Sequence, residues 1–451
     1  MRFAVIDPDG TGLPWAARLH DEGCDVLMYL HERSTKRTGD GIVNKTNSLY
    51  ELLAWAKLKP TIAVFMFSGF GKRGPKVPLG ATEFAAAGIP CVLGDEIMDR
   101  LENDRDWGAK LAAKLGVRQP PSFRFSDAEG AAAFCKAHPD KEWFFKPNDM
   151  SDCDTTSGGK GNDLAEYITH FRTQFGNNHS SIVQMKIPGI AISTAAWFNG
   201  HKFLEPYEGT IEHKKFMNDE LGPSTGCCFN VVWMYDEKPK IAHELKFAEL
   251  APILAAKHCN PGLLDINALI AEEAGPWGPA KVPYFLEWTP RLGWDSEATS
   301  FKLLNTRLCD FLTGLAYRTL PRSPFDTSRL GFGLRVSLSP YPFVPKQKEP
   351  LKPTSFEKPL SGFTSVWRDE FVGYDVMKGP RGFVASTDAP VIGVVTEYGQ
   401  KLSTISEKAL KYAGSLLPKS LQYRTDGGKV LAKDAKKLID LGYSVPKGII
   451  E

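Results

Sequence analysis

The sequence lacks the long apolar runs, the excess of one charge and the paired cysteines that mark membrane, nucleic-acid-binding and disulfide-stabilised proteins. No apolar stretch approaches the roughly 18 residues that a membrane-spanning helix needs. Lys and Arg number 55 against 53 Asp and Glu, and a net charge of +2 gives no overall attraction to a polyanion. The eight cysteines form no Cys-x-x-Cys pair, so we expect neither a zinc site nor a disulfide framework. These absences predict a cytoplasmic protein that binds neither nucleic acid nor a membrane.

The pattern of apolar and helical segments predicts a multidomain protein of mixed α/β and α+β class. Short β-like runs, the first at Phe3–Ile6, alternate with helical stretches such as Leu13–Glu22, which predicts a parallel sheet with helices on its faces. A helix from Asp95 to Leu115 then leads into a region mainly of strands, which ends in a helix at Ser300–Tyr317. The proposed domains are residues 1–95, 96–325 and 326–451.

Two features argue against a dinucleotide-binding turn and against a groove that binds a polyanion. The turn after the first strand, Asp7–Gly12, lies where dinucleotide-binding folds carry glycines, but it lacks G-x-G-x-x-G, and Pro8 removes a backbone donor. The Lys-rich stretches Lys346–Lys358 and Lys429–Lys437 are interpreted as solvated faces or linkers.

A carboxylate at the end of an apolar strand is the strongest single candidate for a functional residue. In Phe285-Leu286-Glu287-Trp288-Thr289, the side chains of Glu287 and Thr289 lie on the same face of the strand. Hard oxygen ligands at this spacing suit Mg²⁺, which takes its remaining ligands from water and phosphate. The alternative is a buried strand-end glutamate that forms an ion pair with Arg291, and the strand by itself favours neither.

Two further segments could contact phosphate. Lys146 ends an apolar strand and is followed by a polar, Gly-containing stretch, where it could meet an anion or remain an ordinary surface lysine. Glu212–Lys215 is followed by Gly222–Gly226, whose glycines permit close backbone approach and whose hydroxyls and amides can donate to an anion. The alternative for Gly222–Gly226 is an ordinary Pro/Gly turn.

The order of these motifs resembles that of the phosphoribosylamine–glycine ligase family of the ATP-grasp superfamily. A strand-end lysine, a strand pair, a His-Lys segment, G-P-x-T-G and E-x-[N/T]-x-R-x-G-x-x-E follow one another as in that family, over nearly the whole chain. Further segments that resemble the family are Gly74–Leu79, Leu101–Val117, Ile182–Ser193 and Gly382–Gly427.

The resemblance implies an ATP-grasp fold with a Rossmann-like amino-terminal domain and a small carboxyl-terminal domain. It also implies a ligase that uses ATP to convert a carboxylate, such as that of glycine, into an acyl phosphate, which an amine then attacks. ATP and Mg²⁺, or Mn²⁺, are the implied cofactors, purine biosynthesis is the implied pathway, and a monomer or weak homodimer is the implied state.

The resemblance also assigns residues to roles, position by position. Glu287 and Thr289 would hold the metal. Arg291, Lys214 and Thr225 would form the catalytic group that holds the acyl-phosphate end of the substrate. The residues implied to bind ATP are Arg105, Lys146, Lys160, Gln184, Met185, Lys186 and Ile187.

The chain departs from the family most clearly where the amine should bind. The family's amino-terminal G-x-G-G-R-E-H-A is replaced by Asp7–Pro14, and Lys76 stands in place of a glutamate. Donors for a sugar phosphate are missing and acids take their place, so the identity of the amine is left open.

Three other departures concern the proposed nucleotide and metal contacts. The phosphate loop, at Asp149–Gly161, carries an acidic Ser/Thr stretch before its Gly-Gly-Lys-Gly. Thr289 replaces a metal-binding asparagine, while Arg105 replaces a lysine and keeps its charge. Ile190 and Ala191 replace an acidic pair that would bind the ribose hydroxyls.

Three hypotheses follow from the sequence. The chain is a glycinamide-forming ligase with altered motifs, a related ligase that uses another amine, or a degenerate ATP-grasp protein that binds a nucleotide or partner without catalysis. Retention of Glu287, Lys146 and Arg291 argues against the third, and the altered amine pocket favours the second over the first.

Overall fold

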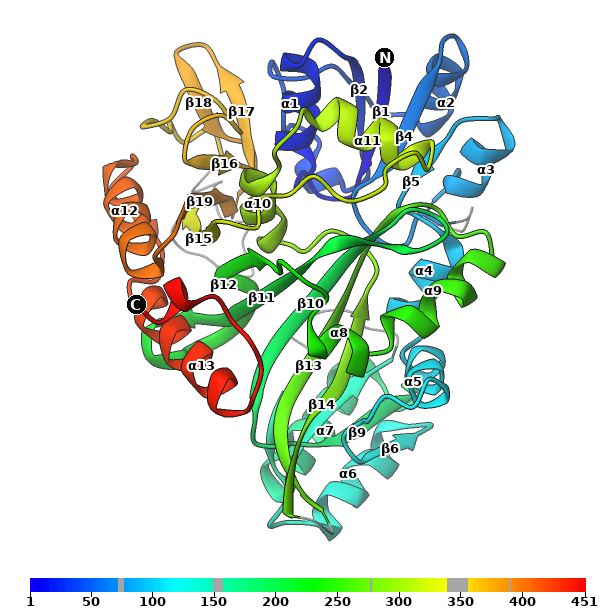
Figure 1. Cartoon of the computed structure of the whole chain (residues 1–451), viewed down its shortest axis with the longest axis vertical. Helices are drawn as coiled ribbons and strands as arrows, with labels where there is room; N and C mark the ends of the chain where they lie inside the picture. Colours follow the sequence, from blue (N-terminus) through cyan, green and yellow to red (C-terminus); the bar gives the residue numbers. More distant parts are fainter. Residues whose placement is uncertain (72–76, 149–156, 276–277, 339–355, 389–390) are drawn as a thin grey trace.

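The computed structural model describes residues 1–71, 77–148, 157–275, 278–338, 356–388 and 391–451. The chain begins with a five-stranded parallel sheet in the order β3-β2-β1-β4-β5 (Figure 1). Its strands are β1 (Arg2–Asp7), β2 (Asp25–Leu30), β3 (Lys45–Thr46), β4 (Thr61–Phe65) and β5 (Cys91–Val92). The helices that pack on it are α1 (Leu13–Asp21), α2 (Leu49–Lys57) and α3 (Ala81–Ala86). The predicted parallel sheet with helices on its faces is confirmed.

A second sheet crosses the middle of the molecule, and its described part has nine strands. Along the sheet these are β14 (Gly278–Thr289), β13 (Gly262–Gly275), β10 (Ile190–Phe198), β11 (Phe203–Met217), β12 (Leu221–Met234), β15 (Leu330–Leu338), β19 (Val391–Gly399) and β16 (Phe371–Gly373), with β20 (Leu421–Gln422) paired to β15. The sheet therefore continues across the proposed boundary at residue 325, since β12 pairs antiparallel with β15.

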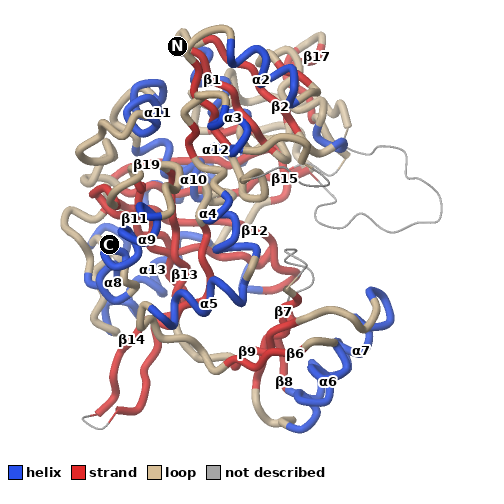
Figure 2. Tube along the Cα trace, turned by 90° about the vertical axis from the view of Figure 1, so that its right-hand side faces the viewer, coloured by secondary structure: helices blue, strands red, loops and turns tan. Residues whose placement is uncertain are grey.

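A small lobe projects from this body (Figure 2). Its four strands, in the order β6-β9-β7-β8, are β6 (Ser122–Phe125), β9 (Ser181–Met185), β7 (Glu142–Pro147) and β8 (Ser157–Lys160). Helices α6 (Ala128–Ala137) and α7 (Gly161–Phe175) pack together and against this sheet. Phe145, Ile168 and Phe171 belong to an apolar core separate from the main one. The lobe therefore has an apolar centre of its own, from which β7 and β9 extend.

The remaining elements lie around the first and second sheets, and one of them, α11 (Leu308–Ala316), packs against α1 and β5 of the first. They are α4 (Glu96–Asn103), α5 (Arg105–Lys114), α8 (Lys240–Glu244), α9 (Phe247–Ala256), α10 (Ser296–Ser300), α11 (Leu308–Ala316), β17 (Val376–Gly379), β18 (Gly382–Ala385), α12 (Leu402–Ser415) and α13 (Gly427–Asp440). Within the described ranges, no helix is long and apolar enough to cross a membrane.

Two helices predicted to be continuous are broken. The predicted helix Asp95–Leu115 is wrong, because Asp104 leaves helical conformation and its carboxylate accepts a hydrogen bond from the Trp107 amide at 3.0 Å, which starts α5. The predicted helix Ser300–Tyr317 is also wrong, because the chain becomes extended at Leu304 before α11 begins.

The Lys-rich stretch Lys429–Lys437 lies on α13. Leu431, Ala435 and Leu438 of this helix are buried, while Lys429 and Lys437 are exposed. The interpretation as a solvated face is confirmed, but the face belongs to an amphipathic helix and not to a linker.

Candidate functional site

The paired strands β13 and β14 bring polar side chains together at one place on the large sheet. Their register sets Asp265 opposite Thr289 and Asn267 opposite Glu287. The Asn267 Nδ2 donates to Thr289 Oγ1 at 3.1 Å and to Asp265 Oδ2 at 3.2 Å. Ser193 Oγ, on β10, donates to Asn267 Oδ1 at 2.7 Å. Three oxygen-bearing side chains of β13 and β14, those of Asp265, Asn267 and Thr289, are therefore held in orientation by hydrogen bonds.

Glu287 stands among positive charges. Its Oε1 lies 4.0 Å from Lys214 Nζ, and 49% of its side chain is exposed, so a ligand could reach the carboxylate. Burial among protein atoms raises the pKa of Glu287, but Lys214, Lys146 and Arg105 outweigh this effect and hold it below its ordinary value. The carboxylate is therefore ionised at neutral pH, as a metal ligand must be.

Arg291 is paired with a residue other than Glu287. Its Nε and Nη2 donate to Glu102 Oε1 at 3.1 and 2.9 Å, and its guanidinium lies 4.2 Å above the centre of the Phe67 ring. The alternative in which Glu287 is a structural partner of Arg291 is therefore not the arrangement in the structure. Glu102 instead orients Arg291 beside the β14 end, within electrostatic range of Glu287.

Lys146 reaches the same region from the small lobe. Its Nζ donates to Gln184 Oε1 at 2.9 Å, across the paired strands β7 and β9. Burial lowers the pKa of Lys146 to about 8, with Glu287 opposing and Arg105 and Lys214 adding to the decrease. Lys146 therefore extends from the lobe within electrostatic range of the Glu287 carboxylate, and it loses its positive charge as the pH rises through about 8.

The segment predicted to meet adenine joins the lobe to the large sheet. The amide of Met185 donates to the Pro121 carbonyl at 2.8 Å and that of Lys186 donates to Glu142 at 3.0 Å. The amide of Ile187 makes no hydrogen bond to another described residue. The Ile187 amide could therefore donate a hydrogen bond to the edge of an adenine base.

The structure does not bring Lys160, a predicted ATP-binding residue, close to Lys146 and Glu287. Lys160 pairs with Glu142 at the start of β7, whereas Lys146 lies at the opposite end of that strand. At about 3.3 Å per residue, the two positions are separated by about 13 Å along the strand. Arg105, by contrast, begins α5 and acts electrostatically on both Lys146 and Glu287. Residues 149–156 of the predicted phosphate loop, and Lys76 with its neighbours at 72–76, lie outside the described residues.

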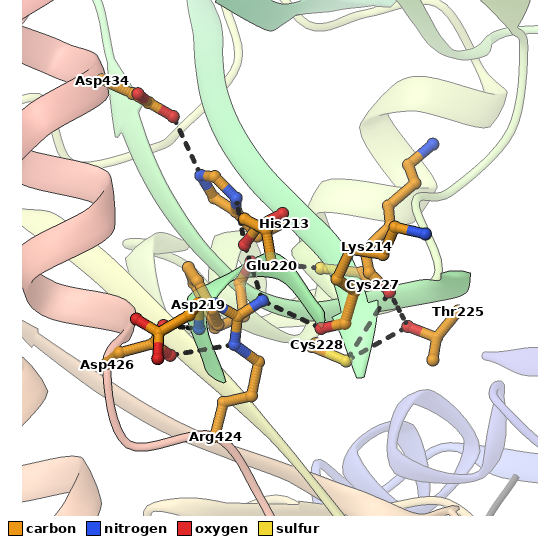
Figure 3. Close-up of polar contacts among 12 residues, drawn as sticks. His213, Lys214, Asp219, Glu220, Thr225, Cys227, Cys228, Arg424, Asp426 and Asp434 are labelled. Atoms are coloured by element: carbon orange, nitrogen blue, oxygen red, sulfur yellow. Dashed lines mark hydrogen bonds and ion pairs between the residues drawn. The ribbon is translucent and has the colours of Figure 1, made fainter. Parts of the chain in front are cut away.

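Lys214 and Thr225 lie on the long hairpin formed by β11 and β12 (Figure 3). Thr225 Oγ1 donates to the Lys214 carbonyl at 2.8 Å, which fixes the backbone from which Lys214 extends. Thr225 itself is buried, and Gly222–Gly226 belong to β12. The alternative of an ordinary turn is therefore wrong, and the threonine supports the lysine.

The carboxyl-terminal segment holds the tip of this hairpin. Arg424 Nη1 donates to Glu220 Oε1 at 2.7 Å and to the Lys215 carbonyl at 2.9 Å, while its Nη2 donates to Asp426 at 2.6 Å (Figure 3). His213 lies between Glu220 and Asp434, at 2.9 and 3.1 Å. Charged contacts from the last part of the chain thus position the strand that carries Lys214.

We expect Arg424→Met to loosen the hairpin and raise the KM for ATP severalfold. The substitution removes a buried charge that holds Glu220 and Asp426, and should lower the free energy of unfolding by about 2–3 kcal/mol. Hydrogen exchange of residues 213–226 should accelerate. The matched control is Lys419→Met, on the same segment but exposed, and equal exchange in the two variants would contradict the anchoring role.

Asp265 and Asn267 are candidate site residues that the sequence interpretation missed. Asp265 is half-buried, and its Oδ1 is buried without a hydrogen-bond partner in the described part of the chain. Acidic and amide side chains two residues apart in the otherwise apolar run 262–271 were the available signal, because such residues share a face.

These residues fit a divalent cation with oxygen ligands. Asp265, whose Oδ1 is buried without a hydrogen-bond partner, lies directly opposite Thr289 on the paired strand. Glu287 lies two residues before Thr289 on β14. Within the described ranges, no three His, Cys, Asp or Glu side chains form a metal site by themselves. This donor set suits Mg²⁺, which is held by one or two carboxylates and takes its other ligands from water and phosphate.

We expect ATP affinity to weaken as the pH rises through about 8. Because the pKa of Lys146 is lowered to about 8, its positive charge is present below that pH and lost above it. The Kd for ATP should increase by up to about tenfold per pH unit above this point. Titration calorimetry from about pH 6 to about pH 10 measures the Kd for ATP. In Lys146→Arg, whose side chain stays charged, the Kd should not depend on pH over this range. A flat wild-type profile would contradict the contact.

The architecture that holds this group is the ATP-grasp fold. The structure of phosphoribosylamine–glycine ligase from Thermotoga maritima matches 94% of this chain and 100% of its own, with a TM-score of 0.69 and 16% sequence identity. Biotin carboxylase from Campylobacter jejuni, in complex with beta-gamma-ATP, matches 98% of this chain and 97% of its own, with a TM-score of 0.60 and 12% identity. N5-carboxyaminoimidazole synthetase from Staphylococcus aureus matches 91% and 96%, with a TM-score of 0.55 and 9% identity.

No protein-family model matches the sequence, and no curated protein matches it. The resemblance to phosphoribosylamine–glycine ligase that the motifs indicated is thus confirmed at the level of the fold.

Proposed function

We propose that this chain is an ATP- and Mg²⁺-dependent carboxylate–amine ligase of the cytoplasm, similar to phosphoribosylamine–glycine ligase. The observation that carries the proposal is the convergence of Glu287 with Lys146, Lys214 and Arg105 where the small lobe meets the large sheet. One ionised carboxylate among three cations, beside a rigid set of oxygen donors, suits a metal-bound polyphosphate. ATP would supply the phosphoryl group that activates a carboxylate, with release of ADP and phosphate after amide formation.

Each residue has a role that follows from its position. Glu287 and Thr289, with Asp265 added, would hold Mg²⁺ or Mn²⁺. Lys146 and Arg105 would neutralise ATP phosphates, and Gln184 would orient Lys146 through the hydrogen bond at 2.9 Å. The backbone of Met185, Lys186 and Ile187 would meet the adenine edge.

The other charged residues would act on the reacting carboxylate. Lys214 extends from the hairpin beside Glu287, and Thr225 fixes its backbone. Arg291 is held by Glu102 and, like Lys214, acts electrostatically on Glu287, so both cations would stabilise negative charge that develops beside this carboxylate. Glycine is the first carboxylate to test, with a place in purine biosynthesis as the expectation from the fold match.

The test is release of ADP by the full chain with Mg²⁺, ATP and glycine, first with phosphoribosylamine and then with a panel of other amines. ADP formation that requires both a carboxylate and an amine supports the ligase. ATP binding without ADP release for any pair would favour the degenerate protein that binds without catalysis. Failure to bind Mg²⁺–ATP would contradict the proposal.

A further inference from the structure

The turn after β1 is closed by its own carboxylates. The amides of Asp9, Gly10 and Gly12 donate to the Asp7 side chain over 2.8–3.2 Å, and the amide of Thr11 donates to Asp9 Oδ1 at 3.2 Å. The remaining residue of the turn is a proline, which has no N–H. Every backbone donor that could have bound an anion is therefore occupied, and the turn presents carboxylates instead.

A buried glutamate lies behind this turn. Only 6% of Glu297 is exposed, and its Oε1 has no hydrogen-bond partner among the described residues. The charged groups that act on it are Asp7, Asp9 and Asp295, all acidic, and with burial they raise the pKa of Glu297 well above its ordinary value. The nearby Arg335 donates to Asp295 at 3.1 Å. A buried carboxylate among acids needs either a proton or a cation to offset its charge.

Glu297 also lines a small cavity with a second buried carboxylate. The cavity has a volume of about 20 Å³, and its walls include Glu208, Trp15, Trp197 and Phe301. A space of this size holds one water molecule or one ammonium group. Aromatic ring faces and carboxylates both attract a cation, whereas they repel or fail to solvate a phosphate.

This acidic group adjoins the proposed reaction centre. Asp9 is partly exposed and acts electrostatically on Arg291, which in turn acts on Glu287. A positive charge held at Asp9 would therefore lie within electrostatic range of Arg291. Glu297 lines the cavity and interacts electrostatically with Asp9.

We propose that the amine substrate of this chain is a cation, an alkyl diamine or polyamine without a phosphate, whose positive charge is held by Asp9 and Glu297. The inference rests on the proposed ligase activity and specifies the amine that this ligase uses. A cationic amine gives Asp9 and the buried Glu297 a common role as its counter-charges. An amine that carries a sugar phosphate would instead be repelled by them.

The test compares two amines of opposite charge on the full-length protein. Titration calorimetry with 1,4-diaminobutane and with O-phosphoethanolamine should show binding of the diamine alone. Asp9→Asn keeps the Oδ1 acceptor for Thr11 but removes the charge, and should weaken diamine binding by about ten- to hundredfold. Glu166→Gln, an exposed acid on α7, is the matched control and should bind as the wild type does.

Glu297→Gln separates binding from folding. Glutamine has nearly the same shape and removes a buried carboxylate from among acids, so the free energy of unfolding should stay equal or increase while diamine binding weakens. Binding of O-phosphoethanolamine in preference to the diamine, binding of neither, or equal binding in wild type and Asp9→Asn would overturn the inference.

The two proposals fail in different ways. Because calorimetry with amines needs no nucleotide, it reports on the cation site even when no turnover occurs. If ATP binds normally and any of the contrary amine results is obtained, only the inference about the amine is contradicted. If the diamine binds and ATP does not, the proposed ligase activity is contradicted, whereas the cation site is supported.

Discussion

Glu287→Gln should lower kcat/KM for ATP-dependent ligation by about a hundred- to thousandfold while the fold is retained. Glutamine keeps the shape of the side chain but loses the charge that faces Lys214 at 4.0 Å and that would bind the metal. Since 49% of the side chain is exposed, glutamine can replace it without repacking of the core, although the pKa of Lys146, which Glu287 raises, should fall further. Initial rates of ADP release across a range of Mg²⁺ concentrations would measure the effect.

The control for this prediction lies on the neighbouring strand. Glu272 is an exposed glutamate of β13, and Glu272→Gln should leave the rate and its Mg²⁺ dependence unchanged. A Glu287→Gln enzyme with wild-type turnover and wild-type Mg²⁺ dependence would show that the carboxylate is not a metal ligand.

Arg335→Met should destabilise the protein by about 3–5 kcal/mol. Arg335 and Asp295 are 3% and 1% exposed, and Arg335 Nε donates to Asp295 Oδ2 at 3.1 Å. Burial already raises the pKa of Asp295 to about 7 while Arg335 opposes the increase, so removal of the arginine leaves a buried carboxylate without its partner. Urea unfolding at neutral pH would measure the loss.

A double variant tests whether the loss comes from the unpaired charge. Arg335→Met with Asp295→Leu should recover a large part of the lost stability, because an apolar pair replaces an ion pair without leaving a charge behind. A double variant that is as unstable as the sum of its two single variants would contradict this explanation.

Local sequence patterns were sufficient for the amino-terminal sheet but not for the long hairpin. In residues 1–95, β1, β2, β4 and β5 are short apolar runs, whose alternation with helical stretches indicates parallel β/α units, whereas β3 is the polar pair Lys45–Thr46. Gly222–Gly226 has the composition of a turn, yet it pairs with β11 through contacts such as Lys215 with Ser224. Strand pairing within the hairpin outweighs the turn preference of these residues here.

The candidate site shows the same division between local and long-range information. The period of two along β14 places Glu287 and Thr289 on one face, which the sequence predicts directly. The partner of Arg291, Glu102, lies 189 residues earlier, and no spacing rule connects them. The register of β13 against β14 is what makes Asp265 and Asn267 candidates, because it sets them opposite Thr289 and Glu287.

The most direct test of the Mg²⁺–ATP site is a crystal structure with Mn²⁺ and a non-hydrolysable ATP analogue, with anomalous scattering used to locate the metal. The ligase account predicts a manganese peak within about 2.5 Å of a Glu287 carboxylate oxygen, with the triphosphate between Lys146 and Lys214. Nucleotide bound elsewhere, or a bound metal that does not touch Glu287, would contradict it.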